Sequence, residues 1–420
     1  CASWAWRATR NPPPGGGSPS PRGPTMADII RFQRAASPLL VPLGRAYAGL
    51  MALRRGLYGA GALPRWRPGA PVVSVGNIGW GGSGKTPLAS WILGWAAGRG
   101  LSTVLLTRGY RSNAPSHPHL VDPASMPEES GDEPLMLARA NPGARVIVDP
   151  VRRRAGAHAE QRFRPDLYVL DDGFQHMAVE RDLDLVLLTP QDLGGKWDLV
   201  CPAGSWREGK GALQGATAFL VRCGPEYFKK LRPILERRLK GYGKPVFNFS
   251  IAPRGLVQVS GQGVAADLGG ERYLLVSGVG DPAQVALTAE GYLGYPPAGH
   301  AAFPDHHLFT KRDVRDLAAQ ARHLGCERIL CTPKDAVKLG PMADDRFWTF
   351  EIDLAFGEDA FGPRGFDVWF ARRMDELFAK YGSRPRSEAH ARDTTGGDDT
   401  PRRNDISNGT KKTEEDDPTD

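Results

Sequence analysis

The sequence feature that most constrains the fold is a glycine-rich loop between an apolar run and a helix-forming segment. The run 72–75 predicts a buried strand, and 88–97 is typical of a helix. Between them, Gly79 to Thr86 fits the spacing G-x-x-x-x-G-K-[ST] of a phosphate-binding loop. Glycines let backbone amides surround an anion, and the helix adds its dipole. A glycine-rich turn with an incidental Lys-Thr pair is the alternative, which both flanks disfavour, so we predict binding of a nucleoside triphosphate.

Individual residues of this loop have distinct chemical tasks. Lys85 would neutralise the β- and γ-phosphate oxygens, and the hydroxyl of Thr86 would ligate Mg²⁺. The predicted nucleotide contacts are Gly79, Gly81, Gly82, Ser83, Gly84, Lys85 and Thr86.

The charge distribution restricts the partners. The chain of 420 residues carries a net charge of +7, and no acidic residue occurs between Asp28 and Asp122. Such a balance suits nucleic acid, an anionic membrane surface or a phosphorylated substrate. No recognised nucleic-acid module is present, so nucleic acid is not expected as a partner. The five cysteines are sparse and odd in number, which favours a reducing compartment and buried structural thiols.

The pattern of apolar runs predicts an α/β protein with a P-loop NTPase-like parallel-sheet core and a second, smaller α/β domain. Continuous apolar runs separated by helical segments indicate a parallel sheet covered on both faces. We expect the core with the phosphate-binding loop at 72–250 and the second domain at 251–360, with a linking hairpin around Pro253 to Gly255. A closing amphipathic helix is expected at 361–382.

The ends of the chain differ from this core. Residues 1–25 are rich in Pro, Gly, Ser and Arg, and we expect a disordered leader with Met26 as the biological start; 383–420 is expected to be a disordered tail. Within 26–71, a basic amphipathic helix is expected to begin near Leu43. It would either lie in a membrane interface or pack on its own domain with solvated arginines. No uncharged run is long enough to span a bilayer.

A second chemical signal follows the apolar run 167–170, which ends in Asp171 and Asp172. A hydrophobic strand that ends in aspartate supplies the carboxylate that a phosphate loop needs for Mg²⁺. Asp172 is the first choice as metal ligand and Asp171 the second. The alternative is a turn that merely uses Asp-Gly.

Several further motifs occur in order along the chain with the phosphate loop: Thr107-Arg-Gly-Tyr-Arg111, Gly131-Asp-Glu-Pro134, Asp171-Asp-Gly-Phe-Gln-His176, Arg207-Glu208, Phe303-Pro-Asp-His-His307 and Thr332-Pro-Lys-Asp335. In this combination the sequence resembles the tetraacyldisaccharide 4'-kinase family of the lipid A pathway. The resemblance implies transfer of the ATP γ-phosphoryl group to the 4'-hydroxyl of a tetraacylated disaccharide 1-phosphate. It also implies a monotopic or peripheral enzyme on the cytoplasmic face of the bacterial inner membrane, which favours 26–71 as a membrane-associating segment. No obligatory protein partner is evident from the sequence.

The resemblance points to Asp132 as the catalytic acid–base group and to a histidine after Asp305 that tunes it. On the residues alone, Asp132 could equally be a helix N-cap. His306 is preferred over His307, and a charged imidazole nearby would lower the pKa of the aspartate. We hypothesise that the second domain closes over the first to assemble the site.

Other polar residues are candidates for binding phosphates or substrate. Arginine matches phosphate oxygens with a planar fork, which favours Arg108, Arg111 and Arg152, although a solvated surface charge is the alternative for each. Gln175 and His176 are expected to position substrate or nucleotide, or to cap a turn. Two other functions stay open at this level: a kinase of a soluble metabolite, and a nucleotide-dependent switch ATPase.

Overall fold

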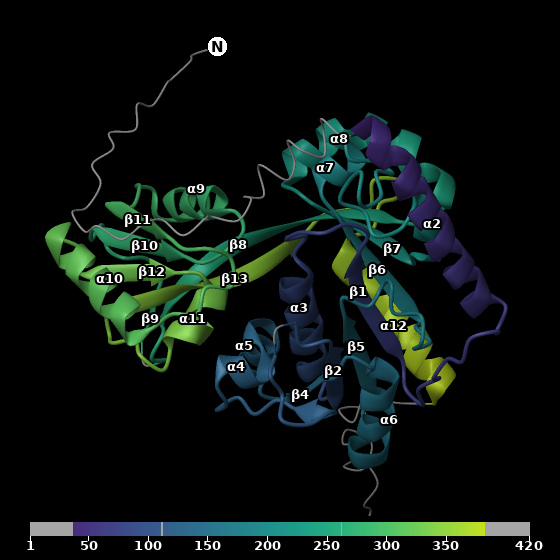
Figure 1. Ribbon diagram of the computed structural model, residues 1–420, viewed down its shortest axis with the longest axis horizontal. Helices are drawn as coiled ribbons and strands as arrows, with labels where there is room; N and C mark the ends of the chain where they lie inside the picture. The colour runs from purple at the N-terminus through teal and green to yellow at the C-terminus, as the bar shows by residue number, and fades with distance from the viewer. Residues whose placement is uncertain (1–36, 111, 262, 383–420) are drawn as a thin grey trace, which may run out of the picture.

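The structure is a computed structural model that describes residues 37–110, 112–261 and 263–382. The expected leader, the expected tail and Arg111 lie outside these residues. The described chain is an α/β protein built on one 13-stranded sheet in the order β11-β10-β12-β13-β8-β7-β6-β1-β5-β2-β4-β3, with β9 beside β8. Figure 1 shows two lobes joined by the long strands β8 and β13. The predicted fold class is confirmed.

The elements have the following bounds. The strands are β1 Val72–Asn77, β2 Thr103–Thr107, β3 His119–Leu120, β4 Ala144–Val148, β5 Leu167–Asp171, β6 Leu183–Leu188, β7 Ala218–Arg222, β8 Val246–Gln258, β9 Val264–Ala265, β10 Tyr273–Ser277, β11 Gly299–Ala302, β12 Arg328–Cys331 and β13 Phe347–Phe356. The helices are α2 Ser37–Gly59, α3 Lys85–Ala97, α4 Pro127–Ser130, α5 Asp132–Ala140, α6 Arg152–Phe163, α7 Pro190–Leu193, α8 Pro225–Arg238, α9 Pro282–Leu293, α10 Lys311–His323, α11 Pro333–Leu339 and α12 Phe366–Tyr381, with 3₁₀ turns η1 Lys210–Gly215 and η2 Lys240–Tyr242.

The first lobe comprises β1 to β7 with the start of β8, helices α3 to α8, and α12. Its strands are parallel except for the short β3. The central strands β1, β5 and β6 are buried along their whole length, as expected for apolar runs covered by helices on both faces. The closing helix α12 returns from the second lobe and packs on α3, with the rings of Trp91 and Phe370 5.5 Å apart.

The predicted hairpin at Pro253 to Gly255 is wrong. Strand β8 continues through these residues and pairs antiparallel with β13 over nearly its whole length. The pairing register shifts between Glu351 and Ile352, opposite Gly255 and Pro253. A β-bulge accommodates a proline that cannot donate a ladder hydrogen bond. The chain therefore crosses between the lobes as a two-stranded ribbon instead of turning back.

The second lobe comprises β9 to β12 and helices α9 to α11, with β13 at its edge towards the ribbon. Strands β10, β11 and β12 are parallel, and Cys326 and Cys331 are buried free thiols, as predicted. Helix α11 faces the first lobe, where Arg139 of α5 donates a hydrogen bond to the backbone oxygen of Val337 at 3.3 Å. Arg139 lies in the last turn of α5, so this contact holds the C-terminal end of α5 against the second lobe.

Among the described residues α2 spans Ser37–Gly59, so the helix includes the predicted start at Leu43 and at least six residues before it. Pro42 lies inside the helix, where its ring replaces the N–H that would otherwise bond one turn back. One face of α2 packs on the first lobe: a side chain at Gly44 would meet the Val200 oxygen at 2.6 Å. No helix in the described ranges is both long and apolar enough to cross a membrane.

Candidate active site

The phosphate loop connects the buried strand β1 to the first residue of α3. Gly81 and Gly84 have φ angles of 120° and 93°, in the region that favours glycine. A Cβ at Gly84 would also lie 3.0 Å from the ring of Phe249. No side chain caps the N-terminus of α3, so its backbone amides and positive dipole end suit an anion.

The two polar residues that open α3 contact the residues expected to share the phosphate site. Lys85 Nζ lies 3.2 Å from Asn77 Oδ1 and 3.6 Å from Asp172 Oδ1. Thr86 Oγ1 donates a hydrogen bond to Glu133 Oε2 at 3.4 Å. The loop is therefore adjacent both to the carboxyl end of β5 and to the start of α5.

The two carboxylates at the end of β5 have opposite electrostatic surroundings. Asp171 is buried and accepts a hydrogen bond from Thr107 Oγ1 at 3.0 Å. Burial, and then the charges of Glu133 and Asp172, raise the pKa of Asp171 to about 6. Burial opposes the ionisation of Asp172 as well, but Lys85 and Arg207 outweigh it and hold the pKa of Asp172 below its usual range.

Arg207 is a site residue to which sequence reasoning gave no role. Its Nη1 lies 2.7 Å from Asp172 Oδ2 and donates to Gln175 Oε1 at 3.3 Å. The guanidinium also lies 4.5 Å from the ring centre of Trp80 in the phosphate loop. Its motif with Glu208 was visible in the sequence, but the contact with Asp172 depends on the packing of separate loops. Arg207 is placed to act on the same anion as Lys85.

The structure resolves which residue of the arginine run 152–154 faces the site. Arg152 is buried at the first position of α6, whereas Arg154 pairs with Asp149 at 2.7 Å and Arg153 is exposed. Asp171 and Asp172 act electrostatically on Arg152, although burial dominates and lowers the pKa of its guanidinium. Arg152 is therefore a buried guanidinium within electrostatic range of the carboxylates that end β5.

The remaining candidates lie around this cluster. Gln175 Nε2 donates to the Asn77 backbone oxygen at 2.9 Å, which fixes the amide beside Arg207. Arg108 is exposed. His176 is partly buried, and its Nε2 is buried without a hydrogen-bond partner among the described residues.

His176 should make the free energy of unfolding depend on pH. Burial, followed by the charges of Arg152 and Arg181, lowers its pKa from 6.5 to about 4. Between these values the unfolded chain binds more protons, so the free energy of unfolding falls as the pH falls. Relative to His176→Gln, the wild type should lose roughly 2–3 kcal/mol from pH 7 to pH 4. Urea denaturation at a series of pH values measures this difference.

The exposed His323 provides the control for the substitution itself, because His323→Gln should leave the urea midpoint at pH 7 unchanged. A constant difference between the wild type and His176→Gln across the range would contradict the prediction.

Asp132 and His306 meet across the two lobes. His306 Nδ1 lies 3.2 Å from Asp132 Oδ2, although the residues are 174 positions apart. Asp132 is the first residue of α5, and Lys338 Nζ lies 3.9 Å from the same oxygen. Burial opposes ionisation here too, but the hydrogen bond with His306 and the charge of Lys338 outweigh it and lower the pKa of Asp132.

His306 and His307 have different partners. His307 Nε2 lies 3.3 Å from Asp313, and its ring stacks on Phe303 at 4.6 Å. His306 instead has a φ angle of 61° that directs its ring towards Asp132 and Tyr110. Of the two histidines, His306 is therefore the one that contacts Asp132.

The residues present fit a nucleotide with Mg²⁺. Ser83 Oγ, Asp171 Oδ1 and Asp172 Oδ1 are buried and lack hydrogen-bond partners within the described chain. In the same ranges, no cluster of three or more His, Cys, Asp or Glu side chains is suited to hold a metal. Mg²⁺ typically takes one or two carboxylates together with substrate phosphates. Thr86 with Asp172 or Asp171 is such an incomplete set.

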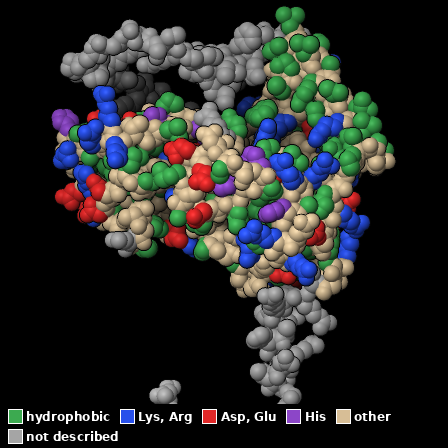
Figure 2. Space-filling view, turned by 60° about the horizontal axis from the view of Figure 1, so that its bottom comes forward, with side chains coloured by type: hydrophobic (Ala, Val, Ile, Leu, Met, Phe, Trp, Pro, Cys, Tyr) green, Lys and Arg blue, Asp and Glu red, His purple; other side chains and the backbone are tan. Residues whose placement is uncertain are grey.

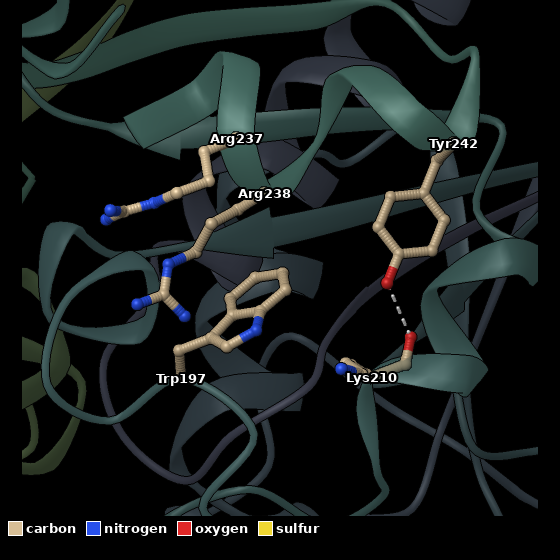
Figure 3. Close-up of a pocket in the computed structure, with 5 residues that line it drawn as sticks. All are labelled: Trp197, Lys210, Arg237, Arg238 and Tyr242. Atoms are coloured by element: carbon tan, nitrogen blue, oxygen red, sulfur yellow. Dashed lines mark hydrogen bonds between the residues drawn. The ribbon is translucent and has the colours of Figure 1, made fainter. Parts of the chain in front are cut away.

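A hollow elsewhere on the first lobe is not part of this site. It has a volume of about 460 Å³ and is lined by Trp197, Lys210, Arg237, Arg238 and Tyr242. Figure 3 shows the hydroxyl of Tyr242 directed at the Lys210 backbone oxygen, to which it donates at 2.9 Å. None of the predicted site residues lines it.

A parallel sheet, a phosphate loop at the start of a helix and carboxylates at the end of a neighbouring strand define a P-loop kinase. The sequence model of the family described as tetraacyldisaccharide-1-P 4'-kinase, LpxK, matches residues 36–364. The chain belongs to this family and is a phosphotransferase.

Three relatives illustrate the similarity. The tetraacyldisaccharide 4'-kinase of Nitratidesulfovibrio vulgaris is 51% identical over 349 residues, which is 83% of this chain and 97% of the relative. That of Oleidesulfovibrio alaskensis is 50% identical over 356 residues, 83% of this chain and 98% of the relative. The crystal structure of Aquifex aeolicus LpxK in complex with ATP has a TM-score of 0.64 and 25% identity, and the match covers 83% of this chain and 99% of that one.

Proposed function

We propose that the protein transfers the γ-phosphoryl group of ATP to the 4'-hydroxyl of a tetraacyldisaccharide 1-phosphate in lipid A biosynthesis. The proposal rests on the position of Glu133, which links the phosphate loop to the Asp132–His306 pair. Thr86 of the phosphate loop donates to its side chain, and the neighbouring Asp132 pairs with His306. These contacts support Asp132 as the acid–base group, because transfer to an alcohol requires such a group beside the triphosphate-binding loop.

Asp132 acts as the general base in this proposal. His306 and Lys338 both contact its Oδ2, so we assign Oδ1 to the acceptor hydroxyl. The hydroxyl oxygen attacks the γ-phosphorus while its proton passes to Asp132. The bond from the γ-phosphorus to the bridging oxygen breaks, and ADP leaves with that oxygen.

Positive side chains offset the charge on the transferring group. Lys85 and Arg207 both contact Asp172, and Arg152 lies within electrostatic range of Asp171 and Asp172. Preorganised charges of this kind stabilise the transition state in phosphoryl transfer. Thr86 and Asp172, with Asp171 as the alternative, would hold Mg²⁺, which neutralises phosphate oxygens when bound.

The full chain with γ-labelled ATP, Mg²⁺ and tetraacyldisaccharide 1-phosphate in mixed micelles tests the proposal. We expect label in the lipid and none with Asp132→Ala. Label transfer to a soluble acceptor in place of the lipid would favour a metabolite kinase. Phosphate release that does not depend on any acceptor would favour a switch ATPase.

Helix α2 supports a membrane-bound location for this reaction. The face opposite its packed side exposes apolar residues, with Leu39 78% and Leu50 60% exposed, together with Leu43, Leu53 and Leu57. Figure 2 shows hydrophobic side chains crowded at the upper right, the side on which Figure 1 places α2. An exposed apolar helix face beside basic residues is typical of a helix that lies in a membrane interface.

Helix α2 also connects this surface to the site. Arg55 pairs with the buried Glu208 at 3.0 Å, next to Arg207, and Arg54 donates to the Gln175 backbone oxygen at 3.2 Å. We therefore propose that α2 holds the enzyme on the cytoplasmic face of the bacterial inner membrane, where the lipid substrate reaches the site.

Leu50→Glu should weaken binding to vesicles of phosphatidylglycerol and phosphatidylethanolamine about tenfold or more, because it removes an apolar side chain from the interface and adds a negative charge. Co-sedimentation measures the binding. Leu287→Glu, on α9 and 64% exposed, is the matched control and should bind as the wild type does. Equal loss in both variants would show that α2 has no special role.

A further inference from the structure

Helix α11 of the second lobe directs two lysines, Lys334 and Lys338, at the Asp132–His306 pair. They are four residues apart and therefore share one helix face. We propose that Lys334 and Lys338 are positioning residues that fix the protonation state of this pair: Lys334 keeps His306 neutral as the Nδ1–H tautomer, and Lys338 keeps Asp132 ionised. The inference rests on the proposed role of Asp132 as the base and goes beyond it.

Lys334 determines which nitrogen of His306 carries the proton. Its Nζ lies 3.1 Å from His306 Nε2, 3.3 Å from Asp305 Oδ1 and 3.9 Å from Glu133 Oε1. An ammonium group has donors and no acceptor, so Nε2 must accept. The single ring proton then lies on Nδ1 and is donated to Asp132 Oδ2 at 3.2 Å.

The charges around His306 explain why a lysine is needed. The ring is faced by Asp132 from α5, by Asp305 from its own loop at 3.9 Å, and by the ring of Tyr110. The two carboxylates would favour a doubly protonated imidazole. Because Nε2 accepts a hydrogen bond from Lys334, its lone pair is not free to bind a second proton. His306 is therefore a neutral hydrogen-bond donor and not the charged imidazole that the sequence suggested.

Lys338 supplies the positive charge that faces the base. Its side chain is 1% exposed, and its Nζ lies 2.9 Å from Asp335 Oδ1 and 3.9 Å from Asp132 Oδ2. The ammonium also lies 5.2 Å from the ring centre of Phe309. A lysine this deeply buried is costly unless it is paired. Asp132 is faced by the ammonium groups of Lys338 and Lys334 and by the hydrogen-bonding ring of His306.

Asp335 anchors this arrangement within the second lobe. It is fully buried and accepts hydrogen bonds from the Gly278 amide at 2.9 Å and from Thr332 Oγ1 at 2.6 Å. The turn Thr332-Pro-Lys-Asp335 thus fixes α11, and α11 fixes both lysines. Since Asp132 belongs to the first lobe, the base reaches its reactive state only when α11 is docked against α5.

The tautomer can be observed without turnover. In protein with ¹⁵N-labelled histidine, with His306→Gln used for assignment, we expect the single ring proton of His306 on Nδ1 and an Nε2 resonance shifted by the hydrogen bond that it accepts. In Lys334→Met this hydrogen bond is lost, and the Nε2 resonance should move to the position of an imidazole nitrogen without a donor. Identical spectra in both proteins would overturn the role of Lys334.

The role of Lys338 is read from the pH profile of kcat/KM. Loss of its charge should raise the pKa of Asp132, so in Lys338→Gln the acidic limb should move to higher pH, while Lys338→Arg should restore it. A uniform loss with an unchanged profile would overturn the role of Lys338. Circular dichroism checks folding, and Lys311→Met, an exposed lysine on α10, is the control.

The spectroscopic result is independent of the reaction catalysed. If another acceptor were phosphorylated, the proposed function would fail while the His306 spectrum would still decide the role of Lys334.

Discussion

Replacement of Asp132 by asparagine should lower kcat for lipid phosphorylation about 10²- to 10⁴-fold, the range for loss of a positioned general base. Asparagine keeps the shape of aspartate, and its carbonyl oxygen can still accept the hydrogen bond from His306 Nδ1. It cannot take the proton of the acceptor hydroxyl at neutral pH. Initial rates at saturating ATP and lipid measure the effect, and the affinity for ATP should change little because the phosphate loop is untouched.

The matched control is Asp375→Asn, since Asp375 pairs with Arg99 on the surface at 2.7 Å. Its kcat should equal that of the wild type. If Asp132→Asn kept more than about a tenth of the wild-type kcat, the base would have to be another group. Comparison of the pH profiles separates this case from a simple change in folding, because only a lost base removes the acidic limb.

The parts of the fold that the sequence predicted are those set by local patterns. The strand before Gly79, the helix after Lys85 and the aspartates after 167–170 depend on residues that are near one another in the chain, and the structure confirms each element. The same holds for α12, whose apolar spacing is that of an amphipathic helix.

The errors arose where long-range pairing decided the structure. Pro253 looked like a turn residue, but its partner strand provides a bulge opposite it. The choice of Arg152 was not an error, but the sequence left its register within 152–154 ambiguous, and only the packing of α6 shows that Arg152 is the buried one.

The candidate site divides in the same way. The phosphate loop and the aspartates follow from spacing alone, whereas the pairing of Asp132 with His306 was expected only from the family resemblance. Two of the motifs given above contain Arg207 and Lys334, and Lys338 follows shortly after the second of them. Their proposed roles nevertheless depend on contacts between separate loops and between the two lobes. No periodicity or spacing encodes such contacts, because they form when separate elements pack.

Lys85→Met should lower kcat by about 10²- to 10³-fold or more, the range for loss of one preorganised group that stabilises developing charge. The methionine keeps the apolar stem but removes the ammonium that lies 3.2 Å from Asn77 and 3.6 Å from Asp172. Rates of lipid phosphorylation measure the loss, and ATP binding by calorimetry shows how much of it lies in the ground state.

Lys210→Met is the control for this variant, because the side chain of Lys210 is 60% exposed and lies outside the site. It should phosphorylate the lipid at the wild-type rate. Wild-type turnover in Lys85→Met would remove the phosphate loop from the mechanism. If instead the affinity for ATP fell while kcat persisted, Lys85 would serve binding alone, and Arg207 and Arg152 would have to stabilise the transferring group by themselves.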